Sequence, residues 1–197
     1  ELALPHLGNR DEIELSAHTL GLCMADAGIE LLHLAVRPVD VEEFNASILK
    51  TDNKSDTHFE AYSDVIGRLL AALPGDAHLV ADRCGGRVHY AGALRRSLGS
   101  GHHIRTASES SHFSTYNVHR EGDDHSVRIS FAARGEDRSF PTALASCMAK
   151  YVRELMMVMI NNWFAERVPD LKRTAGYYVD GNRFLQDIGP LLEDAAF

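Results

Sequence analysis

Segments with strand character and segments with helix character alternate through the middle of the chain, and this alternation limits the fold more than any other feature. "AHLVADR" (77–83) is a short apolar run that ends on charged residues, and the helical pattern "VHYAGALRRSL" follows the flexible "CGG". "HHIRTAS", "HFSTYNVHR" and "SVRISFAAR" are rich in β-branched and aromatic residues, and the turn sequence "EGDDH" predicts that the last two form a hairpin. This order of segments predicts a layered α/β domain.

The remaining sequence is mostly helical in pattern. Asn9 or Asp11 is placed to cap a first helix that ends at Gly28, and Asp40 is placed to cap a short second helix. Between them, "IELLHLAVRPV" (29–39) carries alternating aliphatic side chains and is expected to form a strand. Without a repeat or an obvious linker, the whole chain is expected to form a single domain, residues 1–197. Further helices are expected over residues 57–73, 141–167 and 183–194.

The composition is that of a soluble globular protein without a membrane span. Hydrophobic residues make up 45% of the chain and charged residues 24%, and no apolar run approaches the roughly eighteen residues that a span needs. The three cysteines are widely spaced, which fits neither a disulfide framework nor a paired zinc motif. A cytoplasmic location is therefore expected.

Acidic and basic residues are unevenly distributed along the chain. The net charge of −8 argues against a protein that coats nucleic acid without specificity. Residues 83–108 nevertheless contain no Asp or Glu, and five arginines lie there, Arg83 and Arg87 among them. Such a stretch predicts either an anionic ligand or a solvated basic surface.

Asp82 stands where the predicted strand ends, which is the position at which open α/β sheets bind ligands. Gly85 and Gly86 beside it would allow a substrate or another backbone segment to come close. The structural alternative is that Asp82 only begins the turn or caps the next helix, as Asp often does.

The longest predicted helix carries a file of polar residues. At about 100° per residue, Ser146, Lys150, Arg153 and Glu154 project within about a quarter-turn of one another. A predicted core stripe lies on another side and consists of Met148, Val152, Leu155 and Met159. Lys150 and Glu154 have the i, i+4 spacing of an exposed ion pair, so a surface helix alone would explain the file.

Asp82 and Glu154 together suggest a metal site. Carboxylates from a strand end and from a following helix can share divalent ions, and oxygen ligands suit Mg²⁺ or Mn²⁺. Two such ions about 4 Å apart would activate a water and stabilise the leaving oxygen in phosphodiester hydrolysis. Two carboxylates are too few for a pair of ions, so further ligands are needed.

The segment "ALASCMAKYVRELMM" resembles, in order and spacing, the catalytic helix of the type 2 ribonuclease H family, the family of bacterial ribonuclease HII. Glu154 stands where that helix usually has its last catalytic Asp. "HLVADRCGG" is similar to the strand that ends in the family's third catalytic acid, and "LKRTAGYYVDGNRFLQDI" is similar to its Lys-Gly-Tyr-Gly segment. The resemblance implies a ribonuclease H-like mixed sheet flanked by helices.

The resemblance also implies a role for each matched residue. Asp82 and Glu154 would be catalytic and would bind Mg²⁺ or Mn²⁺. Tyr177 would pack on the sugar beside a ribonucleotide, and Asn53, in the stretch before the strand, would contact nucleic acid. Contacts to phosphates are expected from Ser146, Lys150, Arg83 and Arg87.

Two features depart from the family's pattern. The family's opening strand, with an Asp-Glu pair and a Gly-Arg-Gly loop, has no counterpart before Asp82, and this strand is expected to be missing. The interval from Asp82 to Glu154 is longer than in the family, so residues 88–134 are expected to be an inserted β-hairpin region.

The leading hypothesis is a metal-dependent endonuclease that hydrolyses the RNA part of an RNA/DNA hybrid, or ribonucleotides embedded in a DNA duplex. The alternative is a catalytically inactive ribonuclease H-like module that binds nucleic acid or a protein. A third hypothesis is that residues 100–134 form a homodimer contact, in which case the basic stretch is incidental.

Overall fold

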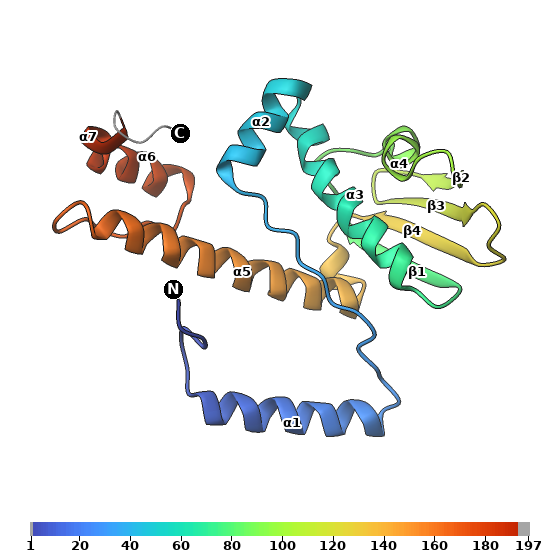
Figure 1. The fold of residues 1–197 in the computed structure, drawn as a ribbon. Coiled ribbons are helices and arrows are strands. Elements are labelled where there is room, and N and C mark those ends of the chain that lie inside the picture. Colours follow the sequence, from blue (N-terminus) through green and yellow to red (C-terminus); the bar gives the residue numbers. More distant parts are fainter. Residues whose placement is uncertain (1, 193–197) are drawn as a thin grey trace. The chain divides into compact units, whose positions relative to one another are not determined.

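The computed structural model describes residues 2–192, which divide into two compact units (Figure 1). The sheet unit comprises Ala35–Lys150, and the helical unit comprises Glu1–Leu34 with Tyr151–Phe197, as far as these residues are described. The long helix α5 (Phe140–Ala165) begins in the sheet unit and ends in the helical unit. The prediction of a single domain stays a prediction.

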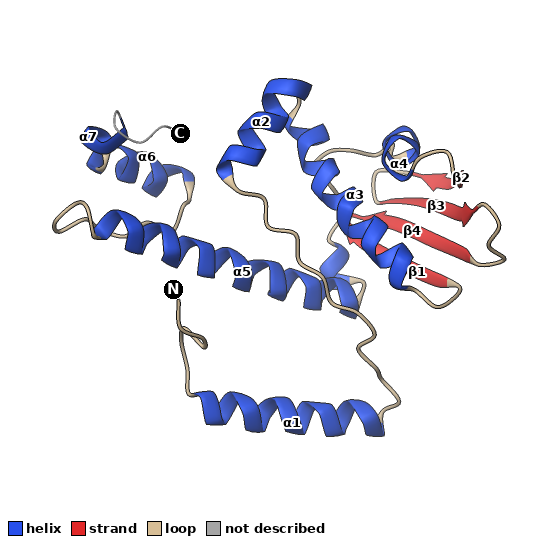
Figure 2. Cartoon of the chain, viewed as in Figure 1, coloured by secondary structure: helices blue, strands red, loops and turns tan. Residues whose placement is uncertain are grey.

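The sheet unit is built on a mixed sheet of four strands (Figure 2). The strands are β1 (Ala77–Asp82), β2 (His102–Glu109), β3 (Phe113–Arg120) and β4 (Ser126–Ala132). Their order in the sheet is β1-β4-β3-β2, in which β2, β3 and β4 are antiparallel neighbours and β1 pairs in parallel with β4. This arrangement confirms the expected α/β fold with a mixed sheet flanked by helices, and it confirms the predicted hairpin.

Two helices cover one face of the sheet (Figure 1). They are α3 (Lys54–Ala72) and α4 (Ala91–Leu98). Because strand side chains alternate between the two faces, every second strand residue points toward these helices. The ring of Phe131 in β4 is fully buried there, stacked 3.7 Å from the ring of Tyr90 and packed against Phe59 of α3. Burial of this apolar face holds the sheet unit together.

The first two helices begin at the predicted caps. The side chain of Asn9 accepts a backbone N–H in the first turn of α1 (Arg10–Asp26). The carboxylate of Asp40 does the same for α2 (Val41–Thr51). Such caps satisfy N–H groups that the helix itself leaves without a partner, which is why both starts could be predicted.

The predicted strand over residues 29–39 is wrong. The segment forms no regular element between α1 and α2, and Leu31 and Leu32 are 56% and 62% exposed. Alternating aliphatic residues form a strand only where a neighbouring strand takes up their hydrogen bonds and a core takes up their side chains. Within the described part of the chain, this segment pairs with no strand.

Residues 88–134, expected as an insertion, form most of the sheet. They contain α4 and three of the four strands, β2, β3 and β4. In this chain the hairpin is therefore part of the hydrophobic core and not an appendage. That the segment is inserted relative to the ribonuclease family stays a prediction.

The helical unit has its own small core. The rings of Phe164 in α5 and Phe184 in α6 (Tyr178–Asp187) meet edge to face, with centroids 5.4 Å apart. A short helix, α7 (Gly189–Leu192), follows. The last residues of the predicted closing helix, 193 and 194, lie outside the described residues.

The helix α5 is the longest, with 26 residues. Its predicted core stripe is only partly buried, because Met148 and Leu155 are half-buried and Met159 is 59% exposed. Among residues 2–192, no helix combines the length and the apolar character needed to cross a membrane.

A chain of hydrogen bonds links the core of the sheet unit to its surface. The hydroxyl of Tyr116 donates to Oε1 of Glu109 and accepts the N–H of Tyr90 at 2.8 Å. Nδ1 of His89 lies 2.6 Å from the other carboxylate oxygen of Glu109. The Tyr116 hydroxyl, and then His89, hold the pKa of Glu109 below its usual value, whereas burial raises the pKa of Tyr116.

Glu109→Gln should lower the free energy of unfolding at pH 7 by about 1–2 kcal/mol, because it replaces a charge-assisted hydrogen bond. The pKa of Glu109 is lower in the folded state than in the unfolded chain, where it is about 4.3. The contribution of Glu109 to the free energy of unfolding is therefore present above about pH 4.3 and is lost as pH falls through the folded pKa. Urea titrations from pH 7 to pH 3 should show the difference from wild type shrinking. Glu121→Gln, in an exposed turn, is the control, and a difference that is independent of pH would contradict the expectation.

Candidate functional site

The predicted site residues are distributed over both units. The sheet unit contains Asn53, Asp82, Arg83, Arg87, Ser146 and Lys150. The helical unit contains Glu154 and Tyr177. Each group is described within its own unit.

Asp82 is the last residue of β1 and lies at the carboxyl end of the parallel strand pair. Its Oδ1 accepts the backbone N–H of Gly135 at 2.8 Å. The two backbones are so close that a Cβ on Gly135 would lie 3.1 Å from the Cα of Asp82. One carboxylate oxygen therefore holds the loop after β4, and Oδ2 has no hydrogen-bond partner among residues 2–192.

Arg83 and Arg87 are both bound to protein groups. A terminal nitrogen of Arg83 donates to the carbonyl oxygen of Ser110 at 2.9 Å. Arg87 forms an ion pair with Asp56, and its guanidinium carbon lies 5.2 Å from the ring centroid of Phe59. With only 15% of its side chain exposed, Arg87 fixes the loop after β1 onto α3. Phosphate contacts by these two arginines stay a prediction.

Asn53 caps α3. Its side-chain oxygen accepts the N–H of Ser55 at 2.9 Å, and its side-chain nitrogen donates to Oδ2 of Asp56 at 3.1 Å. Asn53 and Arg87 thus bind the same carboxylate. These bonds give Asn53 a structural role at the start of α3, and its contact with nucleic acid stays a prediction.

Ser146 and Lys150 lie one turn apart on the first half of α5. Ser146 is half-buried, and Lys150 is exposed. Their i, i+4 spacing puts both side chains on one side of the helix, as the sequence indicated. The ammonium group of Lys150 is open to solvent.

Arg153 organises the polar residues of the helical unit. It donates to Oε1 of Glu154 at 2.6 Å and to the carbonyl oxygen of Ala175 at 2.6 Å. Its guanidinium carbon lies 4.9 Å from the ring centroid of Tyr177. The second carboxylate oxygen of Glu154 has no hydrogen-bond partner among the described residues, and 63% of this side chain is exposed.

The backbone before Tyr177 requires a glycine. Gly176 has a φ of +74°, and a Cβ there would lie 3.0 Å from the Sδ atom of Met157 and 3.3 Å from a guanidinium nitrogen of Arg153. The close approach of this loop to α5 holds Tyr177 in place while its side chain remains exposed, 67% for the residue.

Asn161, Thr174 and Asp180 anchor the same loop, and sequence reasoning missed them. Asn161 donates to the carbonyl oxygen of Thr174 and accepts its N–H, both at 2.8 Å. Asp180 accepts the Thr174 hydroxyl at 2.7 Å, which is the main reason that the pKa of Asp180 lies well below its usual value. An asparagine within the apolar run "MINNWF" was the available signal, because a buried amide needs partners.

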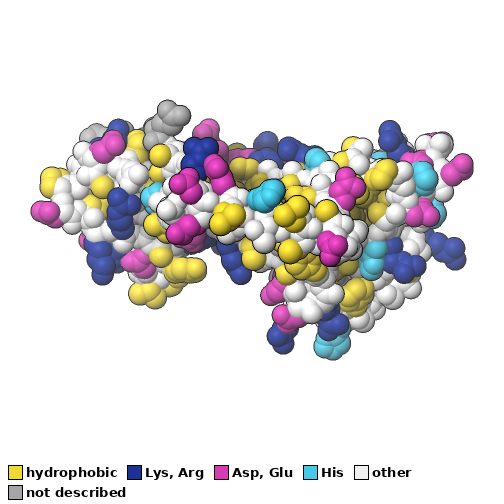
Figure 3. Space-filling view, turned by 90° about the horizontal axis from the view of Figure 1, so that it is seen from below, with side chains coloured by type: hydrophobic (Ala, Val, Ile, Leu, Met, Phe, Trp, Pro, Cys, Tyr) yellow, Lys and Arg dark blue, Asp and Glu magenta, His cyan; other side chains and the backbone are white. Residues whose placement is uncertain are grey.

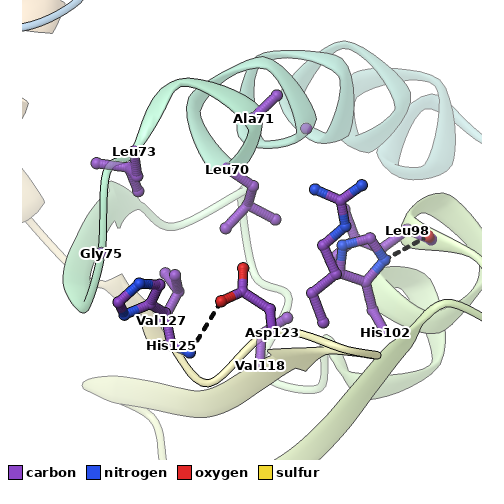
Figure 4. A pocket seen from close by; sticks show the side chains of 12 residues that line it. Leu70, Ala71, Leu73, Gly75, Leu98, His102, Val118, Asp123, His125 and Val127 are labelled. Atoms are coloured by element: carbon purple, nitrogen blue, oxygen red, sulfur yellow. Dashed lines mark hydrogen bonds between the residues drawn. The ribbon is translucent and has the colours of Figure 1, made fainter.

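A pocket of about 230 Å³ lies at the other end of the sheet unit (Figure 4). Its floor is apolar and includes Leu70, and Asp123, His125 and His102 stand around it. Oδ1 of Asp123 accepts the N–H of His125 at 3.0 Å, and Nδ1 of His102 lies 2.8 Å from the carbonyl oxygen of Leu98. Local backbone groups thus already bind the side chains of Asp123 and His102, and none of the predicted site residues lines this pocket.

The described residues form no complete metal cage. Among residues 2–192, no group of three or more His, Cys, Asp or Glu side chains could hold a metal ion. Asp82 and Glu154 each offer one oxygen that the described residues do not bind, and oxygen is the ligand that Mg²⁺ and Mn²⁺ prefer. Each carboxylate, taken within its own unit, therefore suits such an ion in chemical type but supplies only part of its ligands.

Comparison with protein-family models, curated proteins and solved structures found no match for this chain. The resemblance to the type 2 ribonuclease H family therefore rests on the sequence around Asp82, on the segment from Ser146 to Glu154, and on the loop at Tyr177.

Asp82→Ala should lower the free energy of unfolding by about 1 kcal/mol, because the N–H of Gly135 loses its acceptor. Asp82→Asn keeps an oxygen in the same place and should cost less. Urea titrations followed by circular dichroism would measure both values. An alanine variant as stable as wild type would contradict the structural role of this hydrogen bond.

Proposed function

We propose that the chain is a metal-dependent endoribonuclease that hydrolyses RNA in RNA/DNA hybrids or ribonucleotides embedded in DNA. The observation that carries the proposal is the position of Asp82, at the carboxyl end of a parallel strand pair with one carboxylate oxygen not engaged by described residues. Ligands of α/β sheets commonly bind at such ends. Asp82 is also the residue that matches a catalytic acid in the ribonuclease resemblance.

The Tyr177 loop supports the proposal from the other unit. An aromatic ring that is 67% exposed, yet is held by Arg153 and by the tight turn at Gly176, is suited to pack on a sugar or a base. Because the ring is already fixed, little conformational freedom is lost on binding.

Asp82 and Glu154 would be the protein ligands of Mg²⁺ or Mn²⁺. Mg²⁺ is often held by one or two carboxylates together with waters and substrate phosphates, so a carboxylate with one unengaged oxygen suits an ion whose coordination the substrate completes. The bound ion would supply an activated water and would stabilise the leaving oxygen. Arg153 holds one oxygen of Glu154 and leaves the other free to bind.

Lys150 and Ser146 would position the substrate strand. An exposed ammonium group and a hydroxyl one helical turn away offer a charge and a hydrogen-bond donor to neighbouring phosphates. Both lie on the helix that carries Glu154, so phosphate contacts and the metal ligand belong to the same element.

A catalytically inactive module that binds nucleic acid or a protein is the second candidate. It is favoured by the hydrogen bonds of the two acids, since Asp82 holds Gly135 and Glu154 pairs with Arg153. Such bonds give both residues a structural reason to be present without any metal.

Cleavage of a labelled RNA/DNA hybrid, and of a DNA duplex with one ribonucleotide, tests the proposal in Mg²⁺ or Mn²⁺. Asp82→Asn and Glu154→Gln should each slow cleavage by about a hundredfold, because each removes a charged metal ligand. The matched control is Glu166→Gln, since Glu166 is an exposed carboxylate of the helical unit.

Full cleavage by both variants would overturn the nuclease proposal. If the wild-type chain binds both duplexes with a strong salt dependence and cleaves neither in any divalent ion, the inactive module is favoured. Unfolding curves of each variant would separate loss of the site from loss of the fold.

A further inference from the structure

The face of the sheet opposite α3 and α4 carries a regular array of basic and polar side chains. Because side chains alternate along each strand, the strand register places residues from all four strands side by side on this face. One row contains His78, Arg128, Asn117 and Arg105, and the adjoining row contains His119 and His103. These six residues are called the basic face below.

The side chains of the basic face are open to solvent. Five of the six residues are exposed and Asn117 is half-buried, whereas the alternating residues Ile104, Val118 and Ile129 are at most 9% exposed. Figure 3 shows dark blue and cyan side chains over the sheet unit on the right, with magenta side chains among them.

Among the described strand residues, neither of the two rows of the basic face contains an Asp or a Glu. The four strands contain two acids, Glu109 and Asp82. Glu109 is bound to Tyr116, and Asp82 lies at the far end of β1, bound to the N–H of Gly135. Asp76 stands at the rim, where it accepts the N–H of Ser126. In a chain with 28 acidic and 20 basic residues, a face without internal acids is complementary to an anion.

The two arginines of this face, Arg105 and Arg128, carry a permanent positive charge. Partial burial, and then the charge of Arg128, lower the pKa of His78, so His78 is a neutral hydrogen-bonding group there. Its Nε2 lies 2.8 Å from the hydroxyl of Ser130, which holds the ring in place. Arg105 and Arg128 therefore provide charge, and His78 and Asn117 provide neutral hydrogen-bonding groups.

We propose that the basic face is a docking surface for the sugar-phosphate backbone of nucleic acid. Arg105 and Arg128 are two strands apart, about 10 Å at the usual strand spacing, which matches the axial rise of roughly three nucleotides on one strand of a duplex. Guanidinium groups bind phosphates through paired N–H groups, and neutral donors such as Asn117 add contacts. None of the six residues of the basic face has the kind of apolar side chain that a lipid-binding surface inserts into a membrane.

The basic face lies on the same side of β1 as Asp82. His78 and Asp82 are four residues apart, about 13 Å along the strand, and both occupy positions that point away from the helices. A nucleic-acid strand bound to the basic face would therefore lie on the same side of the sheet as Asp82, the proposed catalytic acid. Docking does not require cleavage, so this proposal is independent of the nuclease proposal.

The test is the affinity of the 197-residue chain for fluorescent DNA and RNA/DNA duplexes of about 20 base pairs, measured by anisotropy in EDTA at low salt. Arg105→Glu with Arg128→Glu should weaken binding at least about tenfold and reduce the salt slope by about two. Arg105→Lys with Arg128→Lys should retain binding. The matched control is Lys50→Glu with Arg96→Glu, an equal charge change at exposed helix positions of the same unit.

A second measurement uses the wild-type chain alone. A bound duplex should protect His78, His103 and His119 from diethyl pyrocarbonate, while His18 and His58, exposed on helices, should react as before. Three results would each contradict the proposed docking surface. These are lack of histidine protection, an equal loss of affinity in the control variant, and binding to phosphatidylserine vesicles without binding to a duplex. If the chain binds a duplex at the basic face but does not cleave it, the docking proposal is supported and only the nuclease proposal is weakened.

Discussion

The parallel pairing of β1 with β4 is the contact on which the rest of the structure depends. It joins residues that lie 50 apart in the sequence, from Ala77 with Val127 to Asp82 with Ala132. The pairing brings Asp82 against Gly135 in the loop that leads into α5. The same register aligns His78 with Arg128, so it also determines which side chains share the exposed face. If β1 shifted by one residue against β4, both Asp82 and His78 would turn to the opposite side of the sheet.

Several side chains that look like ligand contacts in the sequence are occupied in the structure. Arg87 and Asn53 share Asp56, which ties the loop after β1 to the start of α3. Part of the acid-free stretch is therefore used to hold the fold. Of the exposed basic side chains of the sheet, His103 and Arg105 belong to that stretch, and the others come from β1, β3 and β4 outside it. Position in the sheet, more than local composition, decides which arginines can meet a ligand.

The helix starts and the hairpin could be predicted because their causes are local. A cap such as Asn9 or Asp40 bonds to an N–H within three residues, and the hairpin strands are joined by a short turn. The segment 29–39 failed because its aliphatic pattern needs a distant partner strand that the sheet does not provide. The site was predicted in part: Asp82 does lie at a strand end, but the sequence could not show that Gly135 binds one of its oxygens. Asn161, Thr174 and Asp180 were missed because their bonds connect a helix to a loop.

By itself the sequence determined the helix starts, the hairpin and the polar file of α5, since these depend on residues that are close along the chain. Only the tertiary structure decided that residues 88–134 build the body of the sheet and that His78, Arg128, Asn117 and Arg105 form one row. The physical reason is strand register. Hydrogen bonds between strands select partners across long loops, and the two-residue alternation of each strand then assigns every side chain to the core or to the open face.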